Sequence, residues 1–144
     1  MNECTEDRFL KDVSDHQMAV ILDDETNRHI RFRKPGTICY GFDLITWPGH
    51  LCIAGDCGTY VFSHIKDMFG FFRAGDWWGK KERKETLFIN PVYWGEKLRS
   101  IGTNAGYKEF AGGVTERYTF HYIWCLYAIA WGIQQYDAEL AKAV

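Results

Sequence analysis

The stretch of residues 40–63 constrains the fold of this chain more than any other part of the sequence. Within it, three runs of alternating apolar residues are separated by two turns, one at Pro48 and Gly49 and one at residues 55–58. Short turns of this kind join neighbouring antiparallel strands. The stretch therefore predicts three consecutive strands of a β-meander.

The two turns also predict which residues lie opposite each other. Counting outward from them pairs Trp47 with His50, Ile45 with Cys52, Asp43 with Ala54, Ala54 with Thr59 and Leu51 with Phe62. Because side chains alternate across a sheet, one face is apolar and is expected to form the core. The predicted core residues are Tyr40, Phe42, Leu44, Leu51, Ile53, Tyr60 and Phe62. The opposite face is half apolar, which indicates partial cover, and a one-residue slip at the Pro-Gly turn would exchange the two faces.

The segment before the meander predicts one helix and two further strands. Thr5 is expected to cap a short helix that carries Phe9, Leu10 and Val13 on one side. Residues 17–22 and 28–34 are expected to be strands on either side of a polar turn at residues 23–27. These two strands extend the predicted sheet to about five.

The segment after the meander predicts helices. Ser63 is expected to cap a helix that ends at Gly75 and whose apolar stripe comprises Ile65, Met68, Phe69 and Phe72. Residues 75–85 show neither a helical nor a strand period and are expected to form an exposed loop.

Two more helices are expected towards the C-terminal end. Asn90 followed by Pro91 is typical of a helix start, and a stripe of Trp94, Leu98 and Ile101 extends this helix to residue 102. Residues 103–115 are expected to be a loop or a weak element. Residues 115–140 predict a last helix, and because it is apolar nearly all round it is expected to be central.

The composition is that of one globular domain. The chain has 144 residues, of which 47% are hydrophobic and 25% are charged. We therefore expect a single α+β domain over residues 1–144. It would be an antiparallel β-meander of about five strands packed against three to four helices, with a central apolar C-terminal helix.

The sequence predicts a soluble cytoplasmic protein. The N-terminus is acidic with no apolar segment behind it, and the longest apolar stretch, residues 118–133, is too short and too mixed for a membrane span. Five cysteines without a framework spacing favour a reducing compartment. The net charge of −2 provides no general attraction to nucleic acid or membrane. No membrane partner is expected, and the sequence predicts no oligomeric state.

The closest resemblance to a metal site is formed by His50, Cys52, Cys57 and His64. Zinc prefers such ligands, but there is no CxxC pair, and strand alternation directs His64 away from the face of His50 and Cys52. We therefore predict no metal and no cofactor. A small metalloenzyme built around Cys52 and Cys57 is the least supported of three functional hypotheses.

Other catalytic arrangements have equally little support. Cys57 lies on a glycine-flanked turn beside Asp56, but a nucleophile also requires a base and a group that orients the base, and the glycines are explained by the turn alone. Asp43 and Asp56 form no better paired-carboxylate site, and no glycine-rich phosphate loop is present. No catalytic residue is predicted, and the balance favours a protein that is not an enzyme.

Two basic stretches are candidates for binding nucleic acid. They are Arg28, Arg31, Arg33 and Lys34 on one strand face, and Lys80, Lys81, Arg83 and Lys84 in the expected loop. Cations neutralise phosphates, and neighbouring aromatic side chains can stack on bases. Acidic neighbours and the low net charge favour ordinary solvated faces instead. Nucleic-acid binding is therefore the second hypothesis.

The adjacent residues Trp77 and Trp78 support the first hypothesis, a binding module. Two adjacent tryptophans in an irregular loop do not both point into one core, and exposed tryptophan is typical of binding sites. Packing in a small satellite cluster is the alternative for this pair. The predicted interaction residues are Trp77, Trp78, Lys80, Lys81, Arg83 and, on a neighbouring turn, Asp56.

Four segments of the chain resemble a family of small proteins encoded by bacteriophages and prophages. They are FDLITWPGHLCIAGDCGTYVF (residues 42–62), KDMFGFFR (66–73), INPVYWGEKL (89–98) and HYIWCLYAIAWGIQQYD (121–137). The four segments lie within residues 42–137, a span of about two thirds of the chain. Residues 101–120 depart from it, being shorter and richer in glycine than in the relatives. If that segment binds a partner in the relatives, this chain would bind it differently or not at all.

The resemblance implies a phage accessory protein made in the bacterial host cytoplasm. Small phage proteins of this kind are often inhibitors of host defence, including CRISPR–Cas, that act by occupying a surface of a partner. The family carries no assigned catalytic residues, so the resemblance assigns no site. The expected partner is accordingly a host or defence-system protein or complex, with nucleic acid as the alternative.

Overall fold

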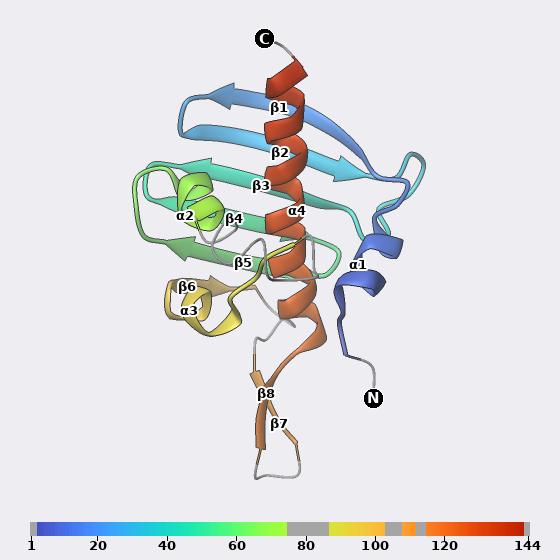
Figure 1. Cartoon of the computed structure of the whole chain (residues 1–144), viewed down its shortest axis with the longest axis vertical. Helices are drawn as coiled ribbons and strands as arrows, with labels where there is room; N and C mark the ends of the chain where they lie inside the picture. The colour runs from blue at the N-terminus through green and yellow to red at the C-terminus, as the bar shows by residue number, and fades with distance from the viewer. Residues whose placement is uncertain (1–2, 75–86, 103–107, 112–114, 143–144) are drawn as a thin grey trace.

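The computed structural model describes residues 3–74, 87–102, 108–111 and 115–142 (Figure 1). In chain order the elements are α1 (Glu6–Asp12), β1 (Gln17–Asp24), β2 (Asn27–Arg33), β3 (Phe42–Trp47), β4 (His50–Gly55), β5 (Gly58–Ser63), α2 (Met68–Ala74), α3 (Pro91–Glu96), β6 (Leu98–Ile101), β7 (Lys108–Ala111), β8 (Thr115–Tyr118) and α4 (Phe120–Lys142). The chain therefore has the predicted α+β architecture.

Strands β1 to β6 form one antiparallel sheet in which every strand lies beside its neighbours in sequence. The predicted register is confirmed at both turns, because Trp47 lies opposite His50 and Leu51 lies opposite Phe62. No slip has occurred at the Pro-Gly turn, where Gly49 has a φ of +83° that suits glycine. The core face is accordingly the predicted one, although Tyr40 is only half-buried.

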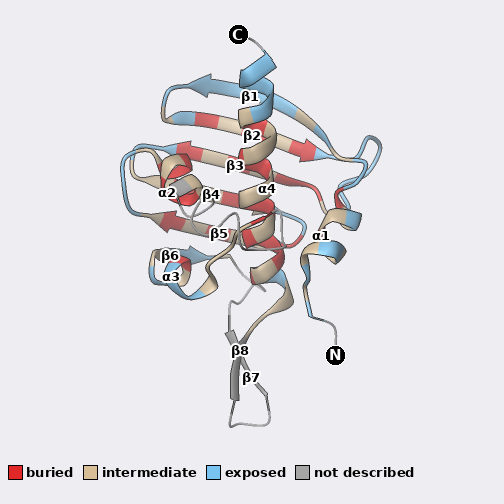
Figure 2. Ribbon diagram, viewed as in Figure 1, coloured by how far each residue is buried: buried red, intermediate tan, exposed pale blue. Residues whose placement is uncertain are grey.

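The helices lie on one side of this sheet, and α4 crosses its strands from the β6 side to the β1 side (Figure 1). Buried residues gather between α4 and the sheet (Figure 2). Those from α4 include Tyr122, Trp124, Leu126, Ile129 and Ile133. Among the described residues, no helix is both long and apolar enough to cross a membrane.

The backbone of α4 lies close to the sheet at Gly132. A Cβ atom placed there would lie 2.7 Å from Cδ1 of Leu44 and 3.2 Å from the ring of Phe32. Both neighbours are fully buried strand residues. Glycine at this position therefore allows the helix to lie directly on β2 and β3.

Two of the predicted helix starts are confirmed. The Thr5 hydroxyl accepts a hydrogen bond from the Arg8 N–H at 3.1 Å, which caps α1. The Asn90 side chain accepts one from the Tyr93 N–H at 3.1 Å, with Pro91 at the first helical position of α3. In both cases the cap residue satisfies an N–H group that has no partner within the helix.

The predicted cap at Ser63 is wrong. Ser63 is the last residue of β5, opposite His50, and its N–H donates to the carbonyl of Lys97. Helix α2 begins at Met68, and the Asp67 carboxylate accepts a hydrogen bond from the Phe69 N–H at 3.1 Å. Ile65 is 45% exposed and is not part of the helix.

The predicted extension of α3 to residue 102 is also wrong. The helix ends at Glu96, and Leu98–Ile101 forms β6, which pairs with β5. The spacing of Trp94, Leu98 and Ile101 fits a helix, but the free edge of β5 provides backbone partners that outweigh the local pattern.

The last helix starts five residues later than predicted, at Phe120, because residues 115–118 form β8. β8 pairs with β7 as a separate two-stranded sheet. The region expected to be a loop or a weak element therefore contributes a short strand, and its residues 103–107 and 112–114 lie outside the described part.

Candidate interaction surface

The structure describes only one of the predicted interaction residues. Trp77, Trp78, Lys80, Lys81 and Arg83 lie outside the described residues. Asp56 is exposed on the turn between β4 and β5.

Asp56 ties this turn to the segment that precedes β3. Its carboxylate accepts a hydrogen bond from the Tyr40 N–H at 2.9 Å, and its own N–H donates to the Gly41 carbonyl at 3.0 Å. It also lines a shallow hollow together with Arg33 and the 70% exposed Ile38. Asp56 therefore has a structural role, because it joins the β4–β5 turn to the segment before β3. Its role in binding a partner stays a prediction.

The first basic stretch does not form the single face that was predicted. Arg28 lies on the core side of β2 and is buried, whereas Arg31 and Arg33 lie on the opposite face. Strand alternation alone accounts for this error, because residues 28 and 31 have opposite parity.

Arg28 is held in a network between the sheet and the helices. Its guanidinium donates two hydrogen bonds to the Asp67 carboxylate, at 3.0 and 3.3 Å, and lies over the ring of Phe69 at 4.2 Å. It also lies 5.5 Å from the ring of Tyr136, whose hydroxyl donates to Asp23 at 2.8 Å. Partial burial raises the pKa of Asp67, but hydrogen bonds from Arg28 and its charge outweigh this and lower that pKa.

Asp43 neutralises much of the charge on the open face. Its carboxylate contacts Nε2 of His29 at 2.6 Å and accepts two hydrogen bonds from Arg31, at 3.2 and 3.3 Å. Partial burial raises the pKa of Asp43, but the hydrogen bonds from Arg31 and His29 lower it further than burial raises it. This carboxylate is therefore engaged in an ion-pair network across β2 and β3.

The residues of the sequence-derived metal set are placed separately. His50 stacks on Trp47 with ring centroids 4.9 Å apart, whereas His64 lies 5.0 Å from the ring of Phe71. Cys57 is buried, and burial together with the nearby Asp56 raises its pKa to about 12. Over the described part of the chain, no three His, Cys, Asp or Glu residues are grouped to hold a metal ion.

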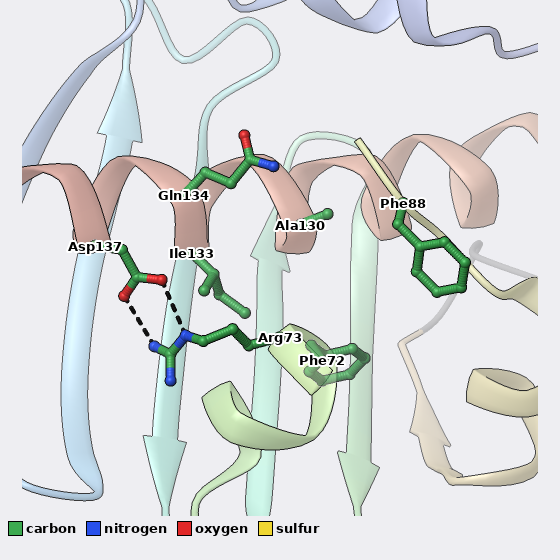
Figure 3. Close-up of a pocket in the computed structure, with 7 residues that line it drawn as sticks. All are labelled: Phe72, Arg73, Phe88, Ala130, Ile133, Gln134 and Asp137. Atoms are coloured by element: carbon green, nitrogen blue, oxygen red, sulfur yellow. Dashed lines mark hydrogen bonds and ion pairs between the residues drawn. The ribbon is translucent and has the colours of Figure 1, made fainter. Parts of the chain in front are cut away.

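One small apolar hollow lies between α2, α4 and the segment before α3 (Figure 3). Its volume is about 30 Å³, and Phe72, Phe88 and Ile133 contribute to its lining. Arg73 and Asp137 bridge one side of it through two hydrogen bonds of 2.9 Å. It has room for about one water molecule, which is too little for an organic ligand.

An unusual surface in the described part of the chain is the edge formed by β1. Seven of its eight residues are exposed, and within the described part of the chain β2 is the single strand that pairs with it. Val20, Ile21 and Leu22 are 47%, 50% and 49% exposed. Natural edge strands usually carry charges or proline that prevent pairing with other chains, so three consecutive apolar residues here indicate a contact surface.

A groove runs between this edge and the C-terminal end of α4. It has a volume of about 320 Å³, and its lining residues are Val20, Asp23, Tyr136, Glu139, Leu140 and Lys142. Val20 lies opposite the buried Ile30 and therefore points to the α4 side of the sheet. Leu140 is 46% exposed, so the groove has an apolar side chain on each wall.

The sequence reasoning missed this surface because residues 19–22 form an unbroken apolar run. A short run of this kind favours a strand buried on both faces. The sequence signal that was available is that apolar and polar residues do not alternate in this run, whereas they would alternate in a strand with one buried face. Only the position of β1 at the end of the sheet shows that the run is exposed.

We compared the chain with protein-family models, with curated proteins and with solved structures, and none of the three comparisons found a match.

Proposed function

We propose that this chain is a non-catalytic binding module that blocks a host protein by occupying one of its surfaces. The observation that carries the proposal is the exposed apolar edge of β1, with Val20, Ile21 and Leu22 each about half exposed. Apolar surface of this kind is costly in water and favours association with a partner. The groove beside Leu140 adds a concave surface to the edge.

The biological setting of the proposal rests on the resemblance to phage and prophage proteins. It is a phage-encoded accessory protein in the bacterial cytoplasm, and its target is a complex of a host defence system, for example of the CRISPR–Cas type. Trp77, Trp78 and the basic residues beside them are proposed as a second part of the same contact.

Phage plating on a panel of strains that each carry one defence system tests this function. Expression of the chain is expected to restore plating in one of them. The Leu140→Asp variant is expected to lose this effect, because it places a charge on the apolar contact. Ile65→Asp is the matched control, since Ile65 is 45% exposed and Leu140 is 46% exposed.

Trp77→Ala and Trp78→Ala are expected to fold normally and to lose the effect as well. If the chain restores plating in no strain, the defence-inhibitor function is wrong. If the Trp variants keep full activity, the blocking function stands and the assignment of the tryptophans is wrong.

The alternative, a nucleic-acid-binding accessory factor, loses some of its expected cations in the structure. Arg28 is bound to Asp67, Arg31 to Asp43, and Nζ of Lys34 lies 3.9 Å from Asp15. Retention on immobilised DNA or RNA that falls steeply with salt would favour this alternative. Nuclease treatment before affinity capture separates the two functions, because a protein partner survives it.

A further inference from the structure

We infer that the groove between β1 and α4 binds an extended segment of the partner, which adds to the sheet as a seventh strand and carries a lysine or arginine. This inference rests on the proposed function and specifies the chemistry of its partner. Three features of the groove support it: an outer strand edge with which no described residue pairs, an apolar contact above that edge, and an excess of negative charge.

The backbone of β1 provides the first feature. Gln17, Met18, Ala19 and Val20 keep a regular register with Arg33, Phe32, Arg31 and Ile30. The register shifts only after Val20, where Ile21 forms a bulge. Residues 17–20 therefore present a regular outer edge, and an extended peptide can satisfy their outward-facing N–H and C=O groups.

The end of α4 provides the second feature. Its last turn lies over β1 and projects past it (Figure 1). An added strand would therefore run beneath Leu140, and its side chains on that face would contact Leu140 and Val20. Alternate residues of the partner segment are expected to be apolar, because only every second side chain points to this face.

Charge provides the third feature. The side chains of Asp23, Glu139 and Lys142 line the groove, and Glu25 lies in the exposed turn that follows β1. Two lining carboxylates thus accompany one ammonium group, and because Nζ of Lys142 lies 3.7 Å from Glu139, the charge of Asp23 has no lining cation to balance it. The C-terminal end of a helix also carries partial negative charge. A cationic side chain in the partner segment complements this arrangement.

The same features disfavour a second copy of the chain as the occupant. Antiparallel pairing of β1 with its own copy would place both α4 helices on the same side of the joined sheet. The two C-terminal ends would then meet head to head over β1, because each projects past that strand (Figure 1). At each end Lys142 lies 3.7 Å from Glu139 and offsets its charge, so it is the partial negative charge of the two helix ends that disfavours this pairing.

Selection from a library of random displayed peptides about twelve residues long tests the inference. The enriched peptides are expected to alternate apolar and polar residues and to carry more Lys and Arg than Asp and Glu. A synthetic enriched peptide is expected to lose at least about ten-fold in affinity for Leu140→Asp and less than about two-fold for Ile65→Asp. If no peptide is enriched, or if Leu140→Asp binds as well as the natural chain, the inference is wrong.

Methylation of the peptide backbone distinguishes strand addition from simple apolar docking. In an edge pair, every second N–H of the added strand faces β1. One alternating set of N-methyl groups is expected to reduce affinity at least about ten-fold, and the other set less than about three-fold. If both sets of N-methyl groups reduce the affinity equally, strand addition is wrong. It is also wrong if the natural chain forms a dimer that the peptide cannot dissociate.

The outcomes for the inference and for the proposed function are separable. If plating depends on Leu140 but no peptide binds the groove, the blocking function stands and the strand addition is wrong. If peptides bind with the expected methylation pattern but plating is never restored, the groove is a peptide site and the defence-inhibitor function is wrong.

Discussion

Arg28 connects β2 with β3, α2 and α4 through one guanidinium group. It contacts the Thr46 hydroxyl, the Asp67 carboxylate and the rings of Phe69 and Tyr136. A buried cation is tolerable only when it is paired, and here the pairing spans segments far apart in sequence. This network therefore fixes the position of the start of α2 against the sheet.

Removal of this guanidinium is expected to destabilise the protein. Arg28→Met keeps most of the apolar volume but leaves the Asp67 carboxylate without its main partner. Because the Asp67 side chain is 41% exposed and can be partly rehydrated, we expect a loss of about 2 kcal/mol, less than for a fully buried pair. Urea unfolding measures this loss as a lower midpoint.

Arg33→Met is the matched control, since Arg33 is exposed on the opposite face of the same strand. Its expected effect is within about 0.5 kcal/mol. Equal midpoints for Arg28→Met and the natural chain would show that the network contributes little to stability.

At the scale of elements, the close contact of α4 with the sheet depends on Gly132. Gly132→Ala gains helix propensity, but the added methyl group would lie 2.7 Å from Cδ1 of Leu44 and 3.2 Å from the ring of Phe32, and both residues are fully buried. Overpacking of a core typically costs about 1–3 kcal/mol, against a propensity gain of up to about 1 kcal/mol. We therefore expect a net loss of about 1 kcal/mol in urea unfolding.

Gly70→Ala in α2 provides the comparison. A Cβ atom at residue 70 would have its nearest neighbour at 3.9 Å, an ordinary contact with Ile65. Here the propensity gain is expected to dominate, with a stabilisation of about 0.5 kcal/mol. If both glycine variants change stability in the same direction, the account of α4 packing at Gly132 is wrong.

The meander could be predicted from sequence because its signals are local. The turns at Pro48-Gly49 and at residues 55–58 set the pairing of β3, β4 and β5, and each strand lies beside its sequence neighbour. The start of α2 could not be predicted, since Ser63 and Asp67 are both good cap residues and only pairing with His50 keeps Ser63 in the strand. The identity of β6 likewise depends on the free edge of β5.

The candidate surface was still less predictable. Whether the run at residues 19–22 is buried or exposed depends on which strand ends the sheet, and that is a property of the assembled topology. The tryptophan pair, by contrast, is a local signal, but residues 77 and 78 lie outside the described part of the chain.

For the molecule as a whole, the paired carboxylates predict how stability depends on pH. The pKa values of Asp43 and Asp67 are lowered in the folded state, so the unfolded chain takes up protons at higher pH than the folded one. Their stabilisation is present above the unfolded pKa of about 3.9 and is lost as pH falls through the folded values. Unfolding free energy is therefore expected to decline below about pH 4.

Asp43→Asn tests the origin of this decline. The variant loses the ion pair with Arg31 and the carboxylate that contacts Nε2 of His29, so it is expected to be less stable at pH 7 and to lose less unfolding free energy as the pH falls. Urea unfolding at a series of pH values measures both effects. If the unfolding free energy of the variant falls as steeply below about pH 4 as that of the natural chain, the decline arises from other carboxyl groups.

The position of α4 in the chain has a consequence for synthesis on the ribosome. All six strands of the sheet precede α4, so they are translated before the helix that covers most of their apolar face. A nascent chain that has emerged through β6 contains α1, α2 and α3 but lacks α4, so Leu44, which lies against Gly132 of α4, is exposed on a partly covered sheet. Such intermediates are prone to aggregate, so rapid completion of α4 or protection by chaperones is expected to favour correct folding during translation.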